Sequence, residues 1–254
     1  MKKIYKYLII AGILLVLFTV WSILVVNDIV DPMDEAIVEA IVSFRGEKGG
    51  FWYWLVRTTT EFAYIFVVIP IALVVIILYK GNLRSLSLAG GMGVMKVTNS
   101  VVKKMICRER PNPLYHWMTE NSYSYPSGHT TSAVVCYGLL AYIIYRSNLK
   151  KSLKYSLIGI QCFIILWVGF TRMVLSVHFF SDIIGGLLSG SLLVVLVIAL
   201  CEFLESKGFD GLPTIITKIK EKKAKKKRDK TLFFLLAKAL FCIQFLSVNL
   251  CFSC

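Results

Sequence analysis

The run FFSDIIGGLLSGSLLVVLVIAL, Phe179–Leu200, decides the class of fold to which this chain belongs. As a helix with a rise of about 1.5 Å per residue, it is long enough to cross the roughly 30 Å of hydrocarbon in a bilayer. Its single charged residue, Asp182, lies near the start. We therefore predict a membrane-spanning helix that carries a carboxylate close to one surface of the membrane.

Five more apolar runs of comparable length precede it. They are Leu8–Val26, Phe62–Tyr79, Leu86–Val102, Thr130–Tyr145 and Tyr155–Phe170. Of the 254 residues, 57% are hydrophobic and 17% are charged. The mean hydropathy of +0.70 is far above that of soluble domains. The sequence therefore predicts an all-α, polytopic membrane protein with a bundle of six transmembrane helices.

The rest of the chain divides by composition. Residues 1–205 hold all six runs and form the predicted core, and residues 206–230 form a basic cytoplasmic tail. Residues 231–254 are an apolar segment that Lys238 interrupts, and its role stays open. Much of the net charge of +14 lies in the tail, where anionic lipid headgroups and not nucleic acid are the expected partner. The scattered cysteines form neither a disulfide framework nor a metal-binding pattern.

The charges of the loops predict how the chain faces the membrane. Loops rich in Lys and Arg stay on the cytoplasmic side, and the N-terminus, residues 80–84, residues 146–154 and the tail share this character. Residues 27–50 are acidic and are predicted to lie outside. We therefore predict a multi-pass protein of the cell membrane with a cytoplasmic N-terminus. Residues 103–110 depart from the charge rule, because they are basic although they should face outward.

A short helix is predicted after the first span. Asp31 followed by Pro32 is a favourable helix start. Four apolar residues then recur at helical spacing and would share one face: Met33, Ile37, Ile41 and Phe44. Such a helix would lie in the outer interface of the membrane, either as a gate for lateral access of lipid or as a simple connector.

Three groups of polar residues follow the odd-numbered spans, so we expect all three to meet at the outer face. In chain order they are Lys103 with Arg110 and Pro111, then Pro126-Ser127-Gly128-His129, then Thr171-Arg172 with His178 and Asp182. The spacing of seven between Lys103 and Arg110 would place both cations on one helical face. A positive charge at the end of a span usually has a task or a partner.

His178 and Asp182 are candidates for chemistry. A spacing of four brings two side chains together on one face if the sixth helix has begun by His178. The carboxylate would then hold one imidazole nitrogen as a donor and leave the other free as a base or nucleophile. An isolated pair of this kind is equally compatible with a hydrogen bond that only fixes the turn.

Ser127, Gly128 and His129 open the fourth span. Unpaired N–H groups and the helix dipole make a helix N-terminus a site for anions, and Gly128 would let a ligand approach the backbone. Taken alone, the motif is also compatible with a simple N-capped helix start.

A divalent metal is an alternative ligand for this pocket, since two histidines and a carboxylate are a known metal-binding set. Three cations expected in the same pocket, Lys103, Arg110 and Arg172, would repel a metal ion and suit a phosphate. This favours phosphoryl transfer without a metal or cofactor. His178 would attack phosphorus, and His129 would protonate the leaving group and then activate water.

The three groups together closely resemble the three-part signature of the type 2 phosphatidic acid phosphatase superfamily. The resemblance rests on Lys103-x6-Arg110-Pro111, Pro126-Ser127-Gly128-His129 and Thr171-Arg172-x5-His178-x3-Asp182 in this order, and it covers roughly residues 1–205. Thr171 departs from the signature, in which serine is usual, but it keeps the hydroxyl. The basic tail has no counterpart in the family pattern.

The resemblance implies a metal-independent phosphatase that acts on lipid phosphates through a phosphohistidine. Phosphatidic acid, phosphatidylglycerophosphate, diacylglycerol pyrophosphate and undecaprenyl pyrophosphate are the implied substrates. The resemblance assigns His178 as nucleophile, His129 as general acid and Asp182 as the residue that orients His178. It assigns phosphate binding to Lys103, Arg110, Ser127, Gly128 and Arg172.

Two other functions fit parts of this pattern. A phosphotransferase would pass the phosphoryl group to another acceptor, and the motifs do not separate it from a hydrolase. A transporter would place charges along a path at the midplane, whereas these charges gather at one face and the spans show no paired broken helices. The motifs contact only phosphate, so the identity of the lipid stays open.

Overall fold

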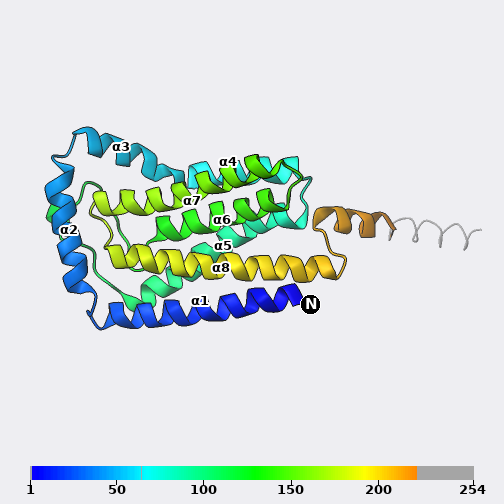
Figure 1. Cartoon of the computed structure of the whole chain (residues 1–254), viewed down its shortest axis with the longest axis horizontal. Helices are drawn as coiled ribbons and strands as arrows, with labels where there is room; N and C mark the ends of the chain where they lie inside the picture. Colours follow the sequence, from blue (N-terminus) through cyan, green and yellow to red (C-terminus); the bar gives the residue numbers. More distant parts are fainter. Residues whose placement is uncertain (1, 64, 222–254) are drawn as a thin grey trace, which may run out of the picture. The chain divides into compact units, whose positions relative to one another are not determined.

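The structure is a computed structural model, and it describes residues 2–63 and 65–221. Every regular element in these ranges is a helix, which confirms the predicted all-α class. The elements, shown in Figure 1, are α1 (Lys2–Val26), α2 (Asp31–Arg45), α3 (Phe51–Thr59), the 3-10 helix η1 (Thr60–Ala63), α4 (Ile65–Leu78), α5 (Leu83–Ile106), the 3-10 helix η2 (Pro113–Tyr115), α6 (Gly128–Arg146), α7 (Lys151–Val174) and α8 (Phe180–Ser206).

The chain up to Asp210 forms one compact unit, and a separate unit begins at Gly211. In that second unit, residues 212–221 are helical. The predicted apolar segment 231–254 lies outside the described residues, as does part of the basic tail 206–230. The division of the chain into a core, a tail and an apolar segment therefore stays a prediction.

A helix lies at each of the six predicted spans, but the helices differ in length and apolar character. In the described ranges, three stretches are both long and apolar enough to cross a bilayer: Lys3–Val26, Lys151–Val174 and Phe180–Ser206. α4 has only 14 residues, which at about 1.5 Å each fall short of roughly 30 Å of hydrocarbon. The count of six spans therefore stays a prediction.

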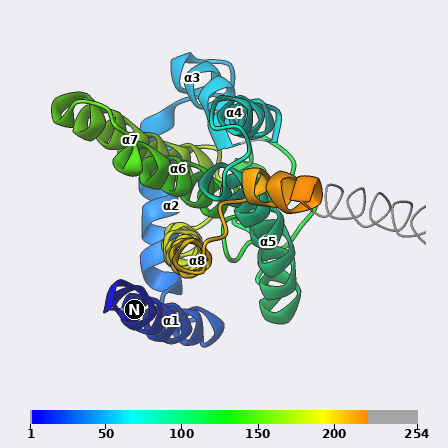
Figure 2. The same cartoon turned by 90° about the vertical axis from the view of Figure 1, so that its right-hand side faces the viewer.

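α6 is the central helix and packs against α5, α7 and α8 (Figure 2). Its first turns are buried although they carry the hydroxyl side chains of Thr130, Thr131 and Ser132. The Thr131 hydroxyl donates to the Ser127 carbonyl oxygen at 2.9 Å, so this buried donor is satisfied within the helix itself. Small polar residues of this kind allow close helix packing in a membrane.

The outer surface of the bundle is strongly apolar. Ile9 and Val16 on α1 are 64% and 61% exposed, and Phe163 and Leu166 on α7 are exposed to a similar extent. The interior, by contrast, holds buried charged groups such as Arg172 and Asp182. Apolar side chains outside and ionic groups inside are expected when lipid surrounds a helical bundle.

α2 lies crosswise at one end of the bundle (Figure 1). It begins at Asp31 with Pro32 in its first turn, as the sequence predicts. It packs against α7 and α8. On the predicted apolar face, Ile37 and Ile41 are partly buried and Phe44 is exposed. The helix itself is confirmed, and its place at a membrane interface stays a prediction.

α3 is a helix that the lengths of the apolar runs do not predict, because its nine residues are too few for a span. Val56 on α3 is fully buried in a cluster with Trp117, Val174 and Leu175. This cluster joins α3 to the loop after η2 and to the end of α7. We call this region, where α2 lies and where α5 and α7 end and α6 and α8 begin, the site end of the bundle.

Candidate active site

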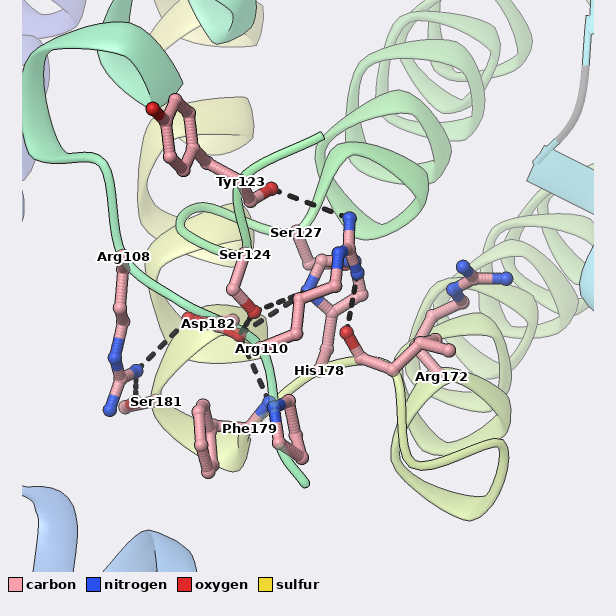
Figure 3. A network of polar contacts seen from close by, with 12 residues as sticks. Arg108, Arg110, Tyr123, Ser124, Ser127, Arg172, His178, Phe179, Ser181 and Asp182 are labelled. Carbon is pink, nitrogen blue, oxygen red and sulfur yellow. Dashed lines mark hydrogen bonds and ion pairs between the residues drawn. The ribbon is translucent and has the colours of Figure 1, made fainter. Parts of the chain in front are cut away.

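All three predicted polar groups meet at the site end (Figure 3). Lys103 lies in the last turn of α5, and Gly128 is the first residue of α6. Arg172 lies in the last turn of α7, and His178 precedes the start of α8. The convergence that was predicted by counting spans is therefore present, although the local geometry differs from the prediction in two places.

The contact between His178 and Asp182 forms, but not on one helical face. α8 begins at Phe180 and its N-cap is Phe179, whose backbone is extended. His178 therefore lies before the helix, so the condition for a shared helical face, that the sixth helix has begun by His178, is not met. Asp182 instead reaches back from the first turn, where it accepts a bond from the Phe179 N–H at 2.9 Å and contacts His178 Nδ1 at 3.2 Å. One carboxylate thus caps the helix and holds the imidazole.

The Asp182 carboxylate is fully buried and is surrounded by donors. Its Oδ2 atom accepts bonds from the Phe179 N–H and, over a very short distance, from the Ser124 hydroxyl, in addition to the contact with His178. Its Oδ1 atom accepts from Arg108 Nη1 at 3.0 Å. A carboxylate has about four acceptor positions, so these four donors satisfy it and fix its orientation.

Arg110 fixes the tautomer of His178. Arg110 Nη1 lies 3.3 Å from His178 Nε2, and a guanidinium can only donate. The Nε2 atom must therefore accept with its lone pair, and the proton of a neutral ring lies on Nδ1, facing Asp182. The Nε2 lone pair is the one that a nucleophile needs.

The surroundings of His178 favour the neutral ring. The side chain is 2% exposed. Burial, followed by the positive charges of Arg110 and Lys103, lowers the pKa of His178 well below its ordinary value. Both effects disfavour the charged form of a histidine. His178 is therefore unprotonated at neutral pH and has a lone pair available at Nε2.

Lys103 and Arg110 converge on one backbone carbonyl. Lys103 Nζ donates to the carbonyl oxygens of Tyr123, over a very short distance, and of Ser124 at 3.0 Å. Arg110 Nη2 donates to the same Tyr123 oxygen at 3.3 Å, as Figure 3 shows. The prediction that both cations share a helical face is wrong, because α5 ends at Ile106 and its C-cap Cys107 has left-handed backbone angles. The loop, and not the helix, brings Arg110 back to the site.

Arg172 is fully buried at the end of α7. Its Nη2 atom forms a very short ion pair with Glu120, and Nη1 donates to the Thr60 hydroxyl at 3.3 Å. Thr171 also donates to that hydroxyl, at 3.1 Å. The hydroxyl at position 171 therefore supports the residue that holds Arg172, which accounts for the tolerance of threonine where serine is usual. Glu120 also lies 3.9 Å from Arg110 Nη2.

Ser127, Gly128 and His129 form the start of α6. Ser127 is the N-cap, and its hydroxyl oxygen accepts from the Thr130 N–H and hydroxyl at 3.5 and 3.0 Å. A Cβ atom at Gly128 would lie 3.2 Å from Asn99 Nδ2 and 3.9 Å from Lys103 Cε, so this turn lies against Lys103. His129 lies within electrostatic range of the predicted nucleophile and of three cations: His178, Arg172, Arg110 and Lys103.

A cleft of about 780 Å³ opens beside these groups. Most of the residues that line it are polar or charged, and they include Lys103, Lys104, Arg108, Arg110, Glu120 and Tyr123. Within the described ranges, no three His, Cys, Asp or Glu side chains are grouped closely enough to hold a metal ion. The cations that line the cleft are suited to an anionic ligand.

Several residues that support the site were missed from the sequence. Ser124 bonds Asp182, Arg108 joins Asp182 to α2, and Glu120 pairs with Arg172. Gly185 was missed as well, although a Cβ atom there would lie 2.4 Å from the ring of Tyr125. The basic departure from the loop-charge rule at 103–110 was the available signal for Arg108. A sequence pattern gives no comparable signal for Ser124 or Glu120, because loop conformation places them.

Comparison with protein-family models matches residues 84–204 to the PAP2 superfamily. The matched range contains all three polar groups, from Lys103 to Asp182. Residues 84–204 of the chain belong to the PAP2 superfamily. The family includes membrane lipid phosphatases, and the resemblance found in the motifs is thereby confirmed.

Among known proteins, this chain is similar to phosphatidylglycerophosphatase B of Bacillus subtilis. The two are 29% identical over 209 residues, which are 78% of this chain and 93% of that protein. It is also similar to lipid A 1-phosphatase of Rhizobium johnstonii, with 36% identity over 93 residues, 35% of this chain and 34% of that protein. The first similarity spans nearly the whole relative, and the second covers only a part.

Two solved structures have a similar fold. A transmembrane PAP2-type phosphatidylglycerolphosphate phosphatase from Bacillus subtilis matches with a TM-score of 0.68 and 27% identity, over 76% of this chain and 96% of that one. LpxE of Aquifex aeolicus matches with a TM-score of 0.50 and 21% identity, over 65% of this chain and 94% of that one. The second likeness shows a shared fold alone.

Proposed function

We propose that this PAP2 protein is an integral membrane phosphatase that hydrolyses phosphomonoester or pyrophosphate headgroups of lipids through a phosphohistidine, without a metal ion. The observation that carries the proposal is the pair of contacts on His178. Asp182 holds Nδ1, while Arg110 contacts Nε2 and so requires a lone pair there. A neutral, oriented imidazole beside cations is what attack on a phosphate requires.

In the first step, His178 Nε2 attacks phosphorus, and the P–N bond forms as the bond to the leaving oxygen breaks. Arg110 moves from Nε2 to the phosphate oxygens, where Lys103 and Arg172 join it and neutralise developing charge. His129 gives its proton to the leaving oxygen. Asp182 stabilises the positive charge that His178 acquires.

In the second step, water attacks phosphorus on the opposite side from Nε2. His129, now unprotonated, takes a proton from this water. The P–N bond breaks, inorganic phosphate leaves, and His178 returns to the neutral tautomer. The amides at the start of α6, at Gly128 and His129, are proposed to bind phosphate oxygens in both steps.

We further propose that the site faces the outside of the cell membrane. Support comes from the loop charges, which favour a cytoplasmic N-terminus, and from the position of α2 at the end of the bundle where α8 begins. The lipid would approach the cleft with its phosphate among the cations and its chains along the apolar helix surface. In this arrangement α2 lies in the outer interface, and α1, α4, α5, α6, α7 and α8 are the six spans.

Phosphatidylglycerophosphate is the first substrate to test, because the Bacillus subtilis relative named phosphatidylglycerophosphatase B matches this chain over 93% of its own length. The experiment compares phosphatidylglycerophosphate, phosphatidic acid, undecaprenyl pyrophosphate and lipid A at equal surface concentration in detergent micelles. Purified protein is assayed for release of inorganic phosphate with and without EDTA. We expect release in EDTA and loss of at least about 10³-fold in His178→Ala.

Three results would contradict the proposal in different ways. Strict dependence on a divalent ion would overturn the mechanism without metal. Turnover only when a second acceptor is added, with little free phosphate, would identify a phosphotransferase. Full activity of a folded His178→Ala variant would remove His178 as the nucleophile.

A further inference from the structure

Asp34 is a buried carboxylate that belongs to none of the three predicted groups. It lies on α2 and is 0% exposed. Its Oδ1 atom accepts from the backbone N–H of Ser181 at 2.9 Å, and its Oδ2 atom accepts from the Ser181 hydroxyl over a very short distance. Asp34 therefore binds the first turn of α8, next to Asp182.

Arg108 links Asp34 to Asp182 directly. Its Nη2 atom lies 2.9 Å from Asp34 Oδ2 and 2.8 Å from Asp31 Oδ1, and its Nη1 atom lies 3.0 Å from Asp182 Oδ1. Figure 3 shows the guanidinium beside Asp182 and Ser181. A guanidinium is a planar fork whose donors point in fixed directions. Because Arg108 Nη2 is held by Asp34 on α2, the position of Arg108 Nη1 beside Asp182 is fixed as well.

The charge of Arg108 matters for the hydrogen bond between Asp182 and His178. A cation that is paired with one carboxylate alone would compete with the imidazole for that carboxylate. Here the buried Asp34 takes part of the interaction with Arg108, so Asp182 keeps Oδ2 turned toward His178. Ser181 and Asp34 also hold the turn of helix from which Asp182 projects.

We propose that Asp34 is a positioning residue that acts on the nucleophile through Arg108 and Asp182. The inference rests on the proposed function, since it requires His178 to be the attacking group. Asp34 does not touch the phosphate in this arrangement. It sets the geometry and the charge balance of the carboxylate that orients His178, from a helix that lies outside all three motifs.

The test is a double-mutant cycle between Asp34→Asn and Asp182→Asn. We expect Asp34→Asn to lower kcat about tenfold with little change in KM, since the phosphate-binding cations are untouched. In the Asp182→Asn background, the same change should lower kcat less than about twofold, because residues in one network do not act independently. A residue that only stabilises the fold would give the full loss in both backgrounds.

Two further variants keep the test decisive. Asp31→Asn is the matched control, since Asp31 contacts the same Arg108 atom but its side chain is 41% exposed, and screening should keep the change in kcat under about twofold. Should Asp34→Asn not fold, Ser181→Ala breaks the same network without changing charge. It should lower kcat about threefold in wild type and have no further effect in Asp182→Asn.

The outcomes separate this inference from the proposed function. Phosphate release by wild type with additive effects of Asp34 and Asp182 would overturn the role of Asp34 alone. A rise in KM at constant kcat would place Asp34 in substrate binding and would also overturn it. Absence of phosphate release from every lipid by wild type would overturn the proposed function itself.

Discussion

The two ends of the α5–α8 bundle both contain ionic groups that are buried or partly buried, and the partners of these groups differ. At the end away from the site, Arg84 pairs with Glu205 at 2.7 Å, and Arg146 forms a very short ion pair with Glu202. Tyr142 donates to Glu202 at 3.0 Å. Each of these cations contacts a carboxylate from a packed neighbouring helix, so the charges are neutralised where they lie.

At the site end, two of the cations are held in place by backbone carbonyl oxygens. Lys103 bonds the carbonyls of Tyr123 and Ser124, and across the described ranges no carboxylate lies within 4.0 Å of its Nζ atom. Arg110 bonds the carbonyls of Ser122 and Val177, with Glu120 at 3.9 Å. A carbonyl positions a cation but does not cancel its charge. The positive charge that remains at the site end favours binding of an anion, whereas the ion pairs at the other end hold neighbouring helices together.

The largest expected contrast is between arginines of the two ends. Arg172→Ala removes a cation proposed to bind phosphate and should lower kcat/KM by about 10³-fold. Arg146→Ala breaks an ion pair at the other end and should lower Tm while leaving kcat/KM within about threefold. Phosphate release and thermal unfolding in the same detergent measure both. Equal losses of activity would mean that the two ends do not differ in function.

Two glycines compare a buried helix contact at the site end with an exposed position on α7. Gly185→Ala would place Cβ 2.4 Å from the Tyr125 ring, and we expect overpacking to destabilise the protein by about 1–3 kcal/mol. Gly159 on α7 has no such neighbour within 4 Å, so Gly159→Ala should be neutral or stabilising by up to about 1 kcal/mol. Thermal unfolding in detergent tests both, and equal Tm values for the two variants would contradict the close packing at Tyr125.

The pH dependence should come from the site end, where all three histidines lie. An ordinary histidine with a pKa of about 6.5 is only about 10% neutral at pH 5.5, but the pKa of His178 is lowered by burial and by Arg110. Phosphoenzyme formation, corrected for ionisation of the substrate and of His129, should therefore stay nearly constant from pH 7.5 to 5.5. At pH 5.5 its rate should be about tenfold above the rate expected for an ordinary histidine.

The stability of the folded protein, unlike this rate, should fall as the pH is lowered. Because the folded pKa of His178 lies below the unfolded one, protons bind the unfolded chain more readily. The contribution of His178 to stability is full above about pH 6.5 and is lost as pH falls toward the folded pKa. For the rate, the contradicting result is phosphoenzyme formation that falls with a midpoint near pH 6.5. That result would show that His178 is not buried and surrounded by cations in the working enzyme.

The smallest contrast is between carboxylates. Glu120 pairs with Arg172 and would compete with a phosphate for it, so Glu120→Gln should lower the inhibition constant of inorganic phosphate about threefold to fivefold. Glu202→Gln at the other end should leave that constant unchanged and lower Tm. Weaker inhibition in Glu120→Gln would show instead that Glu120 holds Arg172 in its working position.

Sequence patterns predicted the parts of the site that depend on helix order. The positions of α5 to α8 follow from apolar run length, and the meeting of Lys103, Arg172 and His178 follows from the alternation of helix direction. The local positions of the His178 and Arg110 side chains were not predicted, because both residues lie in turns whose backbone departs from helical spacing. Cys107 caps the end of α5 and Phe179 caps the start of α8, and neither is a residue type that usually marks such a boundary.

Asp34 and Ser124 show a second limit. Their contacts join residues more than 50 positions apart in the chain, and the contacts depend on the path of a loop and on the angle at which α2 crosses the bundle. Neither feature has a periodic signal in the sequence. A buried acid in a segment that is acidic overall is indistinguishable, by composition, from the exposed acids around it.

α1 shows how the order of synthesis differs from the order of packing. Its indole at Trp21 donates to the Ser181 carbonyl oxygen at 3.0 Å, the Ser22 hydroxyl lies 2.9 Å from that of Tyr125, and the helix packs mainly on α8. α1 is therefore made before its main partner among the described helices, because that partner is α8, the last helix of the bundle. Until α8 is inserted, α1 must stay in the lipid as a separate helix, and its continuous apolar surface is suited to that wait.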